Sequence, residues 1–333
     1  MESYKNKGLG KMKKVTIITC CYNGYEYIDR CFSCIINQTY PNIEFIFVDD
    51  GSTDGSLQKA ESYRAKIANC GIEYILLTER NKGAGGATAL ALKYATGDYI
   101  SNYDVDDILL PHSIEKRACF LEENKTFSIV RTNGYKRKQD NSSVFLVISN
   151  EEKKKENIFI DLLLGKTNNW AGSYMVRSDA LWRVYKDRQI YESRYGQNLQ
   201  ILLAVAYQNK SGFIDEPLME YSYNPNSFTN GCKGLAFEKK KLLGFKDIRL
   251  AILEKLRIND KHIFNMVESY YIKLLMDLDL LYGDKDDFIK LYDRLQEYET
   301  PDYIYKYHFY LTKNLKIKAF YYRVLLFVKN AIK

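Results

Sequence analysis

The sequence predicts an α/β fold, with a mostly parallel sheet flanked by helices and a helical region at the C-terminal end. Three observations support this prediction. Short β-rich apolar runs alternate with helical patterns over roughly the first hundred residues, as in right-handed βαβ units. Acidic residues recur where these runs end. From about Gly234 the pattern is helical, with few glycines and one proline, Pro301. We therefore expect a first domain at residues 1–230 and a helical region at residues 231–333.

The first part of the chain predicts four buried strands with helices between them. The runs expected to form strands are rich in β-branched and aromatic residues, and they lie at residues 14–20, 43–48, 72–77 and 99–103. Helices are expected at 25–38, 56–69 and 83–95. The first has apolar residues at helical spacing, the second follows a turn with capping residues, and the third is rich in alanine.

After Asp107 the alternation loosens. Helices are expected at 112–123, 157–164, 178–184 and 196–207, and strands at 127–130, 143–148 and 170–176. The segment 212–223 is extended but contains Pro217. Proline cannot donate a backbone hydrogen bond to a neighbouring strand, so this segment is predicted to lie at an edge of the sheet.

The stretch Gly97–Asp107 is the part of the chain around which the rest is organised. Side chains alternate along a strand, so Asp104 and Asp106 point the same way at its end. Two such carboxylates repel each other unless a divalent cation or the hydroxyls of a ligand lie between them. A surface turn is the alternative, because aspartate is common in turns and at helix starts.

Other segments favour the ligand site over the turn. In parallel sheets, ligands bind beyond the carboxyl ends of the strands. Tyr22, Asp49 and the acids from Asp104 to Asp107 all lie at such ends. Their convergence on one edge predicts a site for a metal ion and phosphates.

Composition narrows the class of protein. The 333 residues include 29 tyrosines, which suit both sugar binding and amphipathic packing, and the formal charge of +7 does not require nucleic acid. No signal peptide or membrane-spanning run is apparent. The seven cysteines do not form a disulfide pattern, and Cys31 and Cys34 are a lone CxxC pair, so reduced thiols are expected rather than zinc. The chain is expected to be cytoplasmic.

The segment Tyr303–Lys333 contains lysine, arginine and apolar residues but no aspartate or glutamate. A basic amphipathic helix of this kind can lie on an anionic membrane, which would place the protein at the inner face of the cell membrane. The alternative is a helix packed on its own domain with a solvated basic face.

The first half of the chain resembles a family 2 glycosyltransferase with the GT-A fold, of the bacterial capsule or polysaccharide type. The resemblance covers about residues 13–115, and a weaker match continues to about residue 225. It rests on motifs that occur in the family's order: Val15–Ile18 leading to Cys21–Gly24, Ile36–Tyr40, Glu44–Gly55, Asn81–Gly83, and Ala95–Ile100 running to Asp104–Asp107.

The resemblance implies roles for individual residues. Cys20 and Tyr22 would line the nucleotide base, and Asp49 would contact it. Asp104 would meet the ribose or the sugar, and with Asp106 it would form the family's DXD metal motif. Asp106 would bind Mn²⁺ or Mg²⁺, which bridges the diphosphate of the donor. Such a cation offsets the charge that develops on a diphosphate leaving group.

This sequence departs from the family in two places. Thr88 stands where many relatives carry an arginine. The family usually supplies its general base from a Glu-Asp pair at a helix start, and the matching residues here are Gln197 and Asn198, whose amides are not useful bases. Glu192 is a nearby candidate for the base, Asp179 is a poorer one, and Asp106 or Asp107 would act through water.

Gln197 and Asn198 would then bind the acceptor or the donor sugar. Trp170 is a further candidate for the acceptor pocket, because aromatic rings stack on sugars, although core packing explains it equally well.

Two other functions are compatible with the pattern. A nucleotidyltransferase would also use paired carboxylates, but it would carry a glycine-rich basic loop after the first strand, and Cys21–Gly24 is not one. A sugar-nucleotide-binding pseudoenzyme would have lost its base; the amides at 197 and 198 favour it, and the intact Asp104 and Asp106 oppose it. Gly83–Gly86 lacks the spacing of a dinucleotide fingerprint, so close helix packing is expected there.

The sequence thus predicts a metal-dependent, inverting glycosyltransferase that moves one sugar from a nucleotide-sugar donor, with UDP as the expected nucleotide. The acceptor would be a growing surface glycan or a lipid-linked glycan. No nucleic acid partner is expected, and no pattern in the sequence predicts an oligomeric state.

Overall fold

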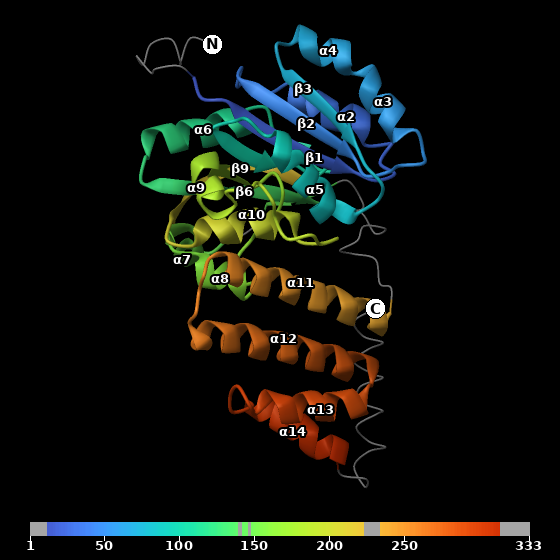
Figure 1. The fold of residues 1–333 in the computed structure, drawn as a ribbon, viewed down its shortest axis with the longest axis vertical. Coiled ribbons are helices and arrows are strands. Elements are labelled where there is room, and N and C mark those ends of the chain that lie inside the picture. The colour runs from blue at the N-terminus through green and yellow to red at the C-terminus, as the bar shows by residue number, and fades with distance from the viewer. Residues whose placement is uncertain (1–11, 139–141, 146–147, 223–233, 314–333) are drawn as a thin grey trace. The chain divides into compact units, whose positions relative to one another are not determined.

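The computed structural model describes residues 12–138, 142–145, 148–222 and 234–313 (Figure 1). The chain divides into two compact units, Met1–Asn230 and Gly231–Lys333. The first unit contains the sheet and the second is helical, and each is described by itself.

The first half of the sheet is parallel. Its strands are β1 (Val15–Cys21), β2 (Ile43–Asp49), β3 (Glu73–Thr78) and β4 (Tyr99–Asn102), in the spatial order β3-β2-β1-β4. The helices that connect them are α2 (Ile28–Ile36), α3 (Ser56–Ser62), α4 (Arg64–Asn69) and α5 (Gly83–Tyr94). Cys21 pairs with Asp49 and Ile18 with Asn102, so β1, β2 and β4 end at the same edge.

Beyond β4 the sheet is mixed. The order continues β8 (Tyr174–Arg177), β6 (Phe127–Arg137), β9 (Lys210–Ser222) and β5 (Ile108–Leu109), with β7 (Ser143–Phe145) paired to β6. The β6–β9 pair is parallel, whereas β4–β8, β6–β8, β5–β9 and β6–β7 are antiparallel. The helices of this half are α6 (Ser113–Glu123), α7 (Asn150–Lys154), α8 (Phe159–Leu163), α9 (Ser178–Val184) and α10 (Gln197–Ala206).

Two details of the predicted strands are wrong. β9 is not an edge strand, because it lies between β6 and β5. Pro217 is tolerated inside it because it faces Asn133, where the register of β6 shifts on both sides. The strand predicted from residue 170 begins only at Tyr174, and residues 170–173 form a turn in which Gly172 has φ +77°.

A buried aromatic cluster fixes one face of the parallel strands. Phe32 of α2 lies 5.4 Å from Phe45 and 5.3 Å from Phe47, measured between ring centroids, and all three are fully buried. Burial of each such ring stabilises the fold by roughly 1.5–3 kcal/mol. This packing holds α2 against β2 and sets the position of the strand ends.

The second unit consists of α11 (Leu235–Lys255), α12 (Lys261–Tyr282), α13 (Lys285–Leu295) and α14 (Tyr303–Lys313). Its core contains Met276, Phe288 and Leu295, and the Tyr292 ring stacks on Phe309 at 3.9 Å. None of the helices in the described residues is long and apolar enough to cross a membrane. Of the basic segment Tyr303–Lys333, α14 is described, and the remainder lies outside the described residues.

Candidate active site

The carboxylate of Asp49 lies at the end of β2, and only one of its two oxygens accepts hydrogen bonds from the described residues. Asp49 is 1% exposed, and its Oδ2 accepts hydrogen bonds from the Ser52 N–H at 3.1 Å and the Thr78 hydroxyl at 3.4 Å. Its Oδ1 is buried and has no hydrogen-bond partner among the described residues. A buried acceptor costs free energy unless a donor reaches it, so this oxygen suits an N–H of a ligand.

The turn after β1 is tied to the turn after β2. The Asn23 N–H donates to Ser52 Oγ at 2.9 Å, and the Thr53 N–H donates to Asn23 Oδ1 at 2.8 Å. Asn23 adopts a left-handed conformation with φ +50°, which asparagine tolerates better than most residues. These bonds hold the Tyr22 ring, which is 54% exposed, at the same edge as Asp49.

Cys20 lies beside α5. Its Sγ is 3.4 Å from Thr88 Oγ1, and burial raises the pKa of the thiol to about 12, so it is a neutral group. Cys20, Tyr22 and Asp49 therefore lie on the adjacent ends of β1 and β2, and their assignment to a nucleotide base stays a prediction. Free cysteines are seen at all six described positions.

The acids that follow β4 form a tight turn, in which the Asp107 N–H donates to the Asp104 carbonyl at 3.2 Å. Burial raises the pKa of Asp104 to about 7, the Asp106 charge adds to the rise, and a hydrogen bond from Gln197 opposes it. The Arg30 guanidinium donates to the backbone carbonyl of Asp106 and so fixes the turn. Asp104 and Asp106 are thus two neighbouring carboxylates, and the charge of Asp106 disfavours ionisation of Asp104.

Asp107, considered from the sequence as a base acting through water, is buried in the structure. It is 1% exposed, and its Oδ1 accepts a hydrogen bond from the Ser222 N–H at 2.9 Å at the end of β9. Burial, with the charges of Asp104 and Asp106, raises its pKa. The contact links β9 to the turn, which is a structural role.

Gln197 and Asn198 are the first two residues of α10, and both reach the end of β4. Gln197 donates to Asp104. Asn198 Oδ1 accepts two hydrogen bonds, from Asn102 Nδ2 at 3.1 Å and from the Tyr174 hydroxyl at 2.9 Å. Tyr174 is fully buried, and burial raises its pKa, so it remains a donor. With its oxygen used twice, the Asn198 amide has its Nδ2 as the group that can still donate a hydrogen bond.

Glu192 is not brought to these carboxylates. It is exposed and lines a cavity together with Lys82, Gly86 and Lys93, on the outer face of α5. Thr88, on the inner face of the same helix, is the residue that contacts Cys20. Glu192 therefore lines a cavity that does not include Asp104 or Asp106, and its role as the base stays a prediction. Asp179, the poorer candidate for the base, is exposed and forms an ion pair with Arg183 on α9 at 3.1 Å.

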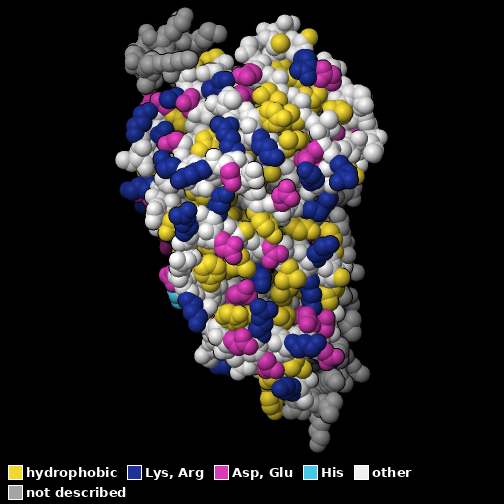
Figure 2. All heavy atoms as spheres, in the orientation of Figure 1, with side chains coloured by type: hydrophobic (Ala, Val, Ile, Leu, Met, Phe, Trp, Pro, Cys, Tyr) yellow, Lys and Arg dark blue, Asp and Glu magenta, His cyan; other side chains and the backbone are white. Residues whose placement is uncertain are grey.

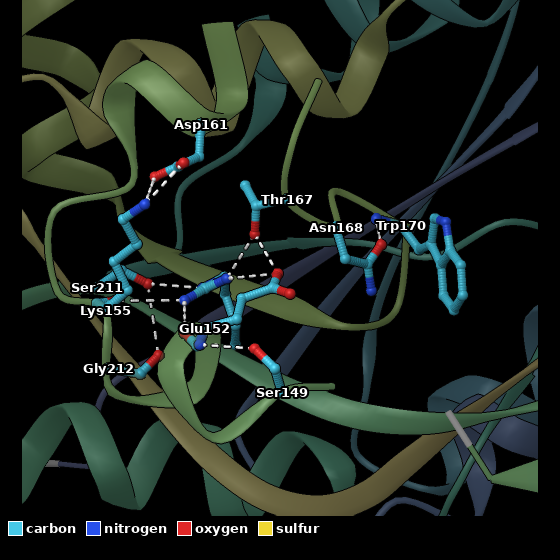
Figure 3. A network of polar contacts seen from close by, with 10 residues as sticks. Ser149, Glu152, Lys155, Asp161, Thr167, Asn168, Trp170, Ser211 and Gly212 are labelled. Carbon is cyan, nitrogen blue, oxygen red and sulfur yellow. Dashed lines mark hydrogen bonds and ion pairs between the residues drawn. The ribbon is translucent and has the colours of Figure 1, made fainter. Parts of the chain in front are cut away.

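Trp170 lies in a turn that a buried network supports (Figure 3). Arg131 is 3% exposed and donates to Ser211 Oγ at 3.0 Å and to Thr167 Oγ1 at 2.8 Å, and Thr167 donates to Glu152 at 2.6 Å. The Asn168 side chain accepts from the Trp170 N–H at 2.9 Å. The indole stacks on Tyr221 at 5.3 Å, and the Gly172 N–H donates to the Asn102 carbonyl at 2.6 Å, which places this turn beside β4.

The donor set at the β4 end fits a hard divalent cation. Both Asp104 and Asp106 offer carboxylate oxygens, and the raised pKa of Asp104 shows that a nearby positive charge would be favourable. A different acidic group occurs in the second unit, where Asp279, Asp284 and Asp287 converge. There Lys239 forms ion pairs with all three carboxylates and takes the place that a cation would occupy.

Sequence reasoning missed the role of Asn102. It is the last residue of β4 and lies two residues before Asp104, which follows the strand, so extended backbone spacing favours the same face for both. That period-two relation was the available signal. Tyr174 was considered for the acceptor pocket together with Trp170 and Trp182, but its hydrogen bond to Asn198 was not predicted, because their proximity depends on the antiparallel β4–β8 pair.

Comparison with known proteins identifies the family to which this chain is similar. Residues 16–185, just over half of the chain, match the family described as "Glycosyl transferase family 2". Among curated relatives, the putative glycosyltransferase EpsE of Bacillus subtilis is 35% identical over 119 residues, which cover 36% of this chain and 42% of EpsE. Chondroitin synthase of Escherichia coli is 33% identical over 128 residues, 38% of this chain and 18% of that protein. The matches span less than half of both relatives.

Two solved structures share the fold. Staphylococcus aureus TarS residues 1–349, in complex with UDP-GlcNAc, has a TM-score of 0.54 at 18% identity, and the alignment covers 85% of this chain and 90% of that chain. The mannosyltransferase PcManGT from Pyrobaculum calidifontis, in complex with GDP-Man and Mn²⁺, has a TM-score of 0.55 at 14% identity, covering 99% and 92%.

The fold is therefore that of the GT-A glycosyltransferases, as the sequence predicted. The chain belongs to glycosyl transferase family 2.

Proposed function

We propose that this protein transfers a single sugar from a nucleotide-sugar donor, a UDP-sugar, to a glycan or lipid-linked acceptor in cell-surface polysaccharide synthesis. Residues 1–230 would be the glycosyltransferase domain. One observation carries the proposal: the neighbouring carboxylates of Asp104 and Asp106 follow the end of β4, on the same sheet edge as a buried oxygen of Asp49 that has no hydrogen-bond partner among the described residues.

Asp104 and Asp106 would hold the Mn²⁺ or Mg²⁺ ion. When bound, this ion would offset the negative charge of the diphosphate as it leaves the sugar. Oxygen donors suit either ion, and few protein ligands are needed because phosphates and water complete the coordination shell. PcManGT, which shares the fold, has been solved with Mn²⁺ and a nucleotide sugar, and this supports the assignment.

The chain's other residues would bind and orient the donor. Asp49 Oδ1 would accept an N–H from the base, and the Tyr22 ring would pack on the base. Cys20 would border it as a neutral thiol. Asn198 Nδ2 would donate to a sugar hydroxyl, because its Oδ1 is already bound twice. The Trp170–Tyr221 pair would offer an aromatic surface to the acceptor.

Transfer is proposed to be inverting, with direct attack of the acceptor hydroxyl on the anomeric carbon. The breaking bond joins that carbon to the diphosphate, and the hydroxyl proton leaves to a base. Asp106, acting through a water molecule, is the proposed base. The other two candidates are less suitable, because Asp107 is bound to the Ser222 N–H and Glu192 lies on the outer face of α5.

We further propose that the protein works at the inner face of the cell membrane. α14 supports this location: Tyr303, Tyr307 and Tyr310 lie on one exposed face of that helix, and Tyr303 is 79% exposed. Tyrosine suits the level of lipid headgroups, and the acid-free segment to Lys333 would favour anionic lipid. On the face of the molecule shown in Figure 2, cationic and acidic side chains are interspersed, which does not suggest a nucleic acid surface.

A sugar-nucleotide-binding module without transfer activity is the second candidate. It is favoured by Asn198, whose amide stands at the helix start and is held by two donors rather than serving as a base. The two candidates differ in turnover but not in donor binding.

The Asp106→Ala variant tests the metal assignment. We expect Mn²⁺-stimulated donor hydrolysis or transfer to fall by about a hundredfold or more, because the cation loses a ligand. Activity is measured with a panel of nucleotide sugars, and folding is checked by circular dichroism. Glu151→Ala, at an exposed residue of α7, is the control and should stay at the wild-type level. Full activity of Asp106→Ala would remove the assignment, and donor binding without turnover in the wild type would favour the binding module.

A further inference from the structure

A cavity of about 360 Å³ lies outside the proposed donor site. It is bounded by the outer face of α5 and by the two segments 79–82 and 192–194. Lys82, Gly86, Ala89 and Lys93 line it at helical spacing, whereas Thr88 faces Cys20 on the other side of the helix. Its volume is in the range of small-molecule sites.

Cations predominate in the lining. They are Arg80, Lys82, Lys93 and Arg194, against two acids, Glu79 and Glu192. Lys82 and Glu79 form an ion pair at 3.0 Å and so offset each other. Arg80, Lys93 and Arg194 then face the single remaining carboxylate of Glu192, which leaves a net positive cavity.

Arg194 is held in place by neutral groups. Its Nη2 donates to Asn81 Oδ1 at 2.5 Å, and its Nη1 donates to the Asn81 carbonyl at 3.2 Å. Asn81 fixes the guanidinium without cancelling its charge, and the Asp50 carboxylate, outside the lining, is a nearby acid that interacts with it. Ala89 and Leu90 add apolar surface to the lining.

A short strap, residues 193–195, connects this cavity to the segment that bears the Asp104 and Asp106 carboxylates. A Cβ added to Gly85 would lie 2.3 Å from the Ser193 carbonyl oxygen, and one added to Gly83 would lie 2.6 Å from the Arg194 carbonyl oxygen. The strap 193–195 therefore lies directly on the first turn of α5. Two residues beyond it, Gln197 donates to Asp104. The cavity and the β4 end are thus on two sides of one strap.

We propose that this cavity binds an anionic group, a phosphate or a carboxylate, carried by an extended acceptor glycan. The group belongs to a residue of the acceptor some distance from the hydroxyl that receives the sugar. The inference rests on the proposed function, because it takes the β4 end as the place of transfer. It identifies the acceptor as an acidic or phosphate-bearing glycan rather than a neutral one.

The test measures binding of glucose 6-phosphate, glucuronic acid and glucose to the full-length protein by ligand-observed NMR. EDTA is present, so that no divalent cation occupies the carboxylates. We expect both anions to bind and glucose not to bind. Arg80→Gln/Lys93→Gln should weaken anion binding about tenfold, and Glu192→Gln should strengthen it, since one removes attraction and the other removes repulsion.

Lys166→Gln/Lys186→Gln is the control, because it removes two exposed lysines elsewhere and changes the net charge equally. It should change the affinity less than about twofold. An equal loss in this control, or no anion binding at about 10 mM, would overturn the proposal. Displacement of glucose 6-phosphate by UDP would also overturn it, because the cavity would then be part of the donor site. The donor-binding experiment with Mn²⁺ has a separate readout, so failure of the proposed function is distinguishable.

Discussion

Asn198 illustrates how one residue's chemistry is set by its neighbours. Its Oδ1 is bound by Asn102 and by Tyr174, and these come from two strands that are antiparallel neighbours. An amide whose oxygen is occupied twice presents its nitrogen as a donor. The residue is thereby suited to hold a sugar hydroxyl and unsuited to remove a proton.

Replacing Tyr174 by phenylalanine tests this arrangement. The change removes one of the two donors and leaves Asn198 Oδ1 with a single partner, so the amide is held less firmly. Loss of a buried hydrogen bond costs about 1 kcal/mol, and we expect nucleotide-sugar affinity to fall about fivefold. Isothermal titration calorimetry with Mn²⁺ and the best donor measures this.

Tyr185→Phe is the matched control, because Tyr185 is also buried and donates to the Gln200 carbonyl at 3.2 Å, further along α10. It should cost stability without changing donor affinity. Equal donor affinities for both variants and the wild type would show that Tyr174 does not orient a ligand-binding group.

At the scale of single elements, α5 and the strap 193–195 depend on each other. Gly83 and Gly85 lack side chains, and the backbone of the strap occupies the space that a Cβ would take. Close helix packing was expected for these glycines, and it is confirmed. The strap in turn leads to Gly196, whose φ of +68° starts α10 and directs Gln197 toward the β4 end.

The Gly85→Ala variant should loosen that contact. Alanine favours a helix over glycine by about 1 kcal/mol, but a Cβ 2.3 Å from a carbonyl oxygen forces the strap to move, and such overpacking costs about 1–3 kcal/mol. We expect a lower melting temperature and faster amide hydrogen exchange in residues 192–197.

Ala84→Ser, one residue earlier in α5, adds a single atom without that clash and serves as the control. A Gly85→Ala protein that melts with or above this control, and whose strap exchanges no faster, would show that the packing is not tight.

How far the sequence predicted these elements depends on how local their determinants are. The parallel strands and α5 could be predicted from apolar runs, helical spacing and turn residues. Asp49, Asp104 and Asp106 could be predicted as site candidates from their places at strand ends.

The position of Glu192 could not be inferred, because it depends on which face of α5 the strap crosses. The burial of Asp107 likewise depends on β9, more than a hundred residues away in the chain, whose Ser222 N–H it binds. Pro217 misled because the register of the β6–β9 pairing shifts on both sides of it, which has no sequence signal, and this shift accommodates the proline.

At the scale of the whole molecule, the sheet unit contains the candidate site and the helical unit carries the exposed tyrosine face of α14. In the proposed function, the sheet unit would bind the donor and the helical unit would bind the membrane surface that carries a lipid-linked acceptor.

Vesicle binding by the full-length chain tests the membrane proposal. Because tyrosine and lysine favour an anionic interface, we expect co-sedimentation with phosphatidylglycerol vesicles and little with phosphatidylcholine alone. Tyr303→Ser/Tyr307→Ser/Tyr310→Ser should reduce binding about tenfold, whereas Tyr94→Ser, at an exposed tyrosine on α5, should leave it unchanged. Equal binding by the triple variant would exclude α14 as the contact.

The central claim is that Asp104 and Asp106 hold a divalent cation against the diphosphate of a nucleotide sugar. A crystal structure of the protein with Mn²⁺ and the best-binding donor, with anomalous data collected for manganese, tests it most directly. We predict an anomalous peak beside the Asp106 carboxylate, with the diphosphate on its far side and the base near Asp49. A bound donor with no manganese at the end of β4, or with these carboxylates turned away from it, would contradict the account.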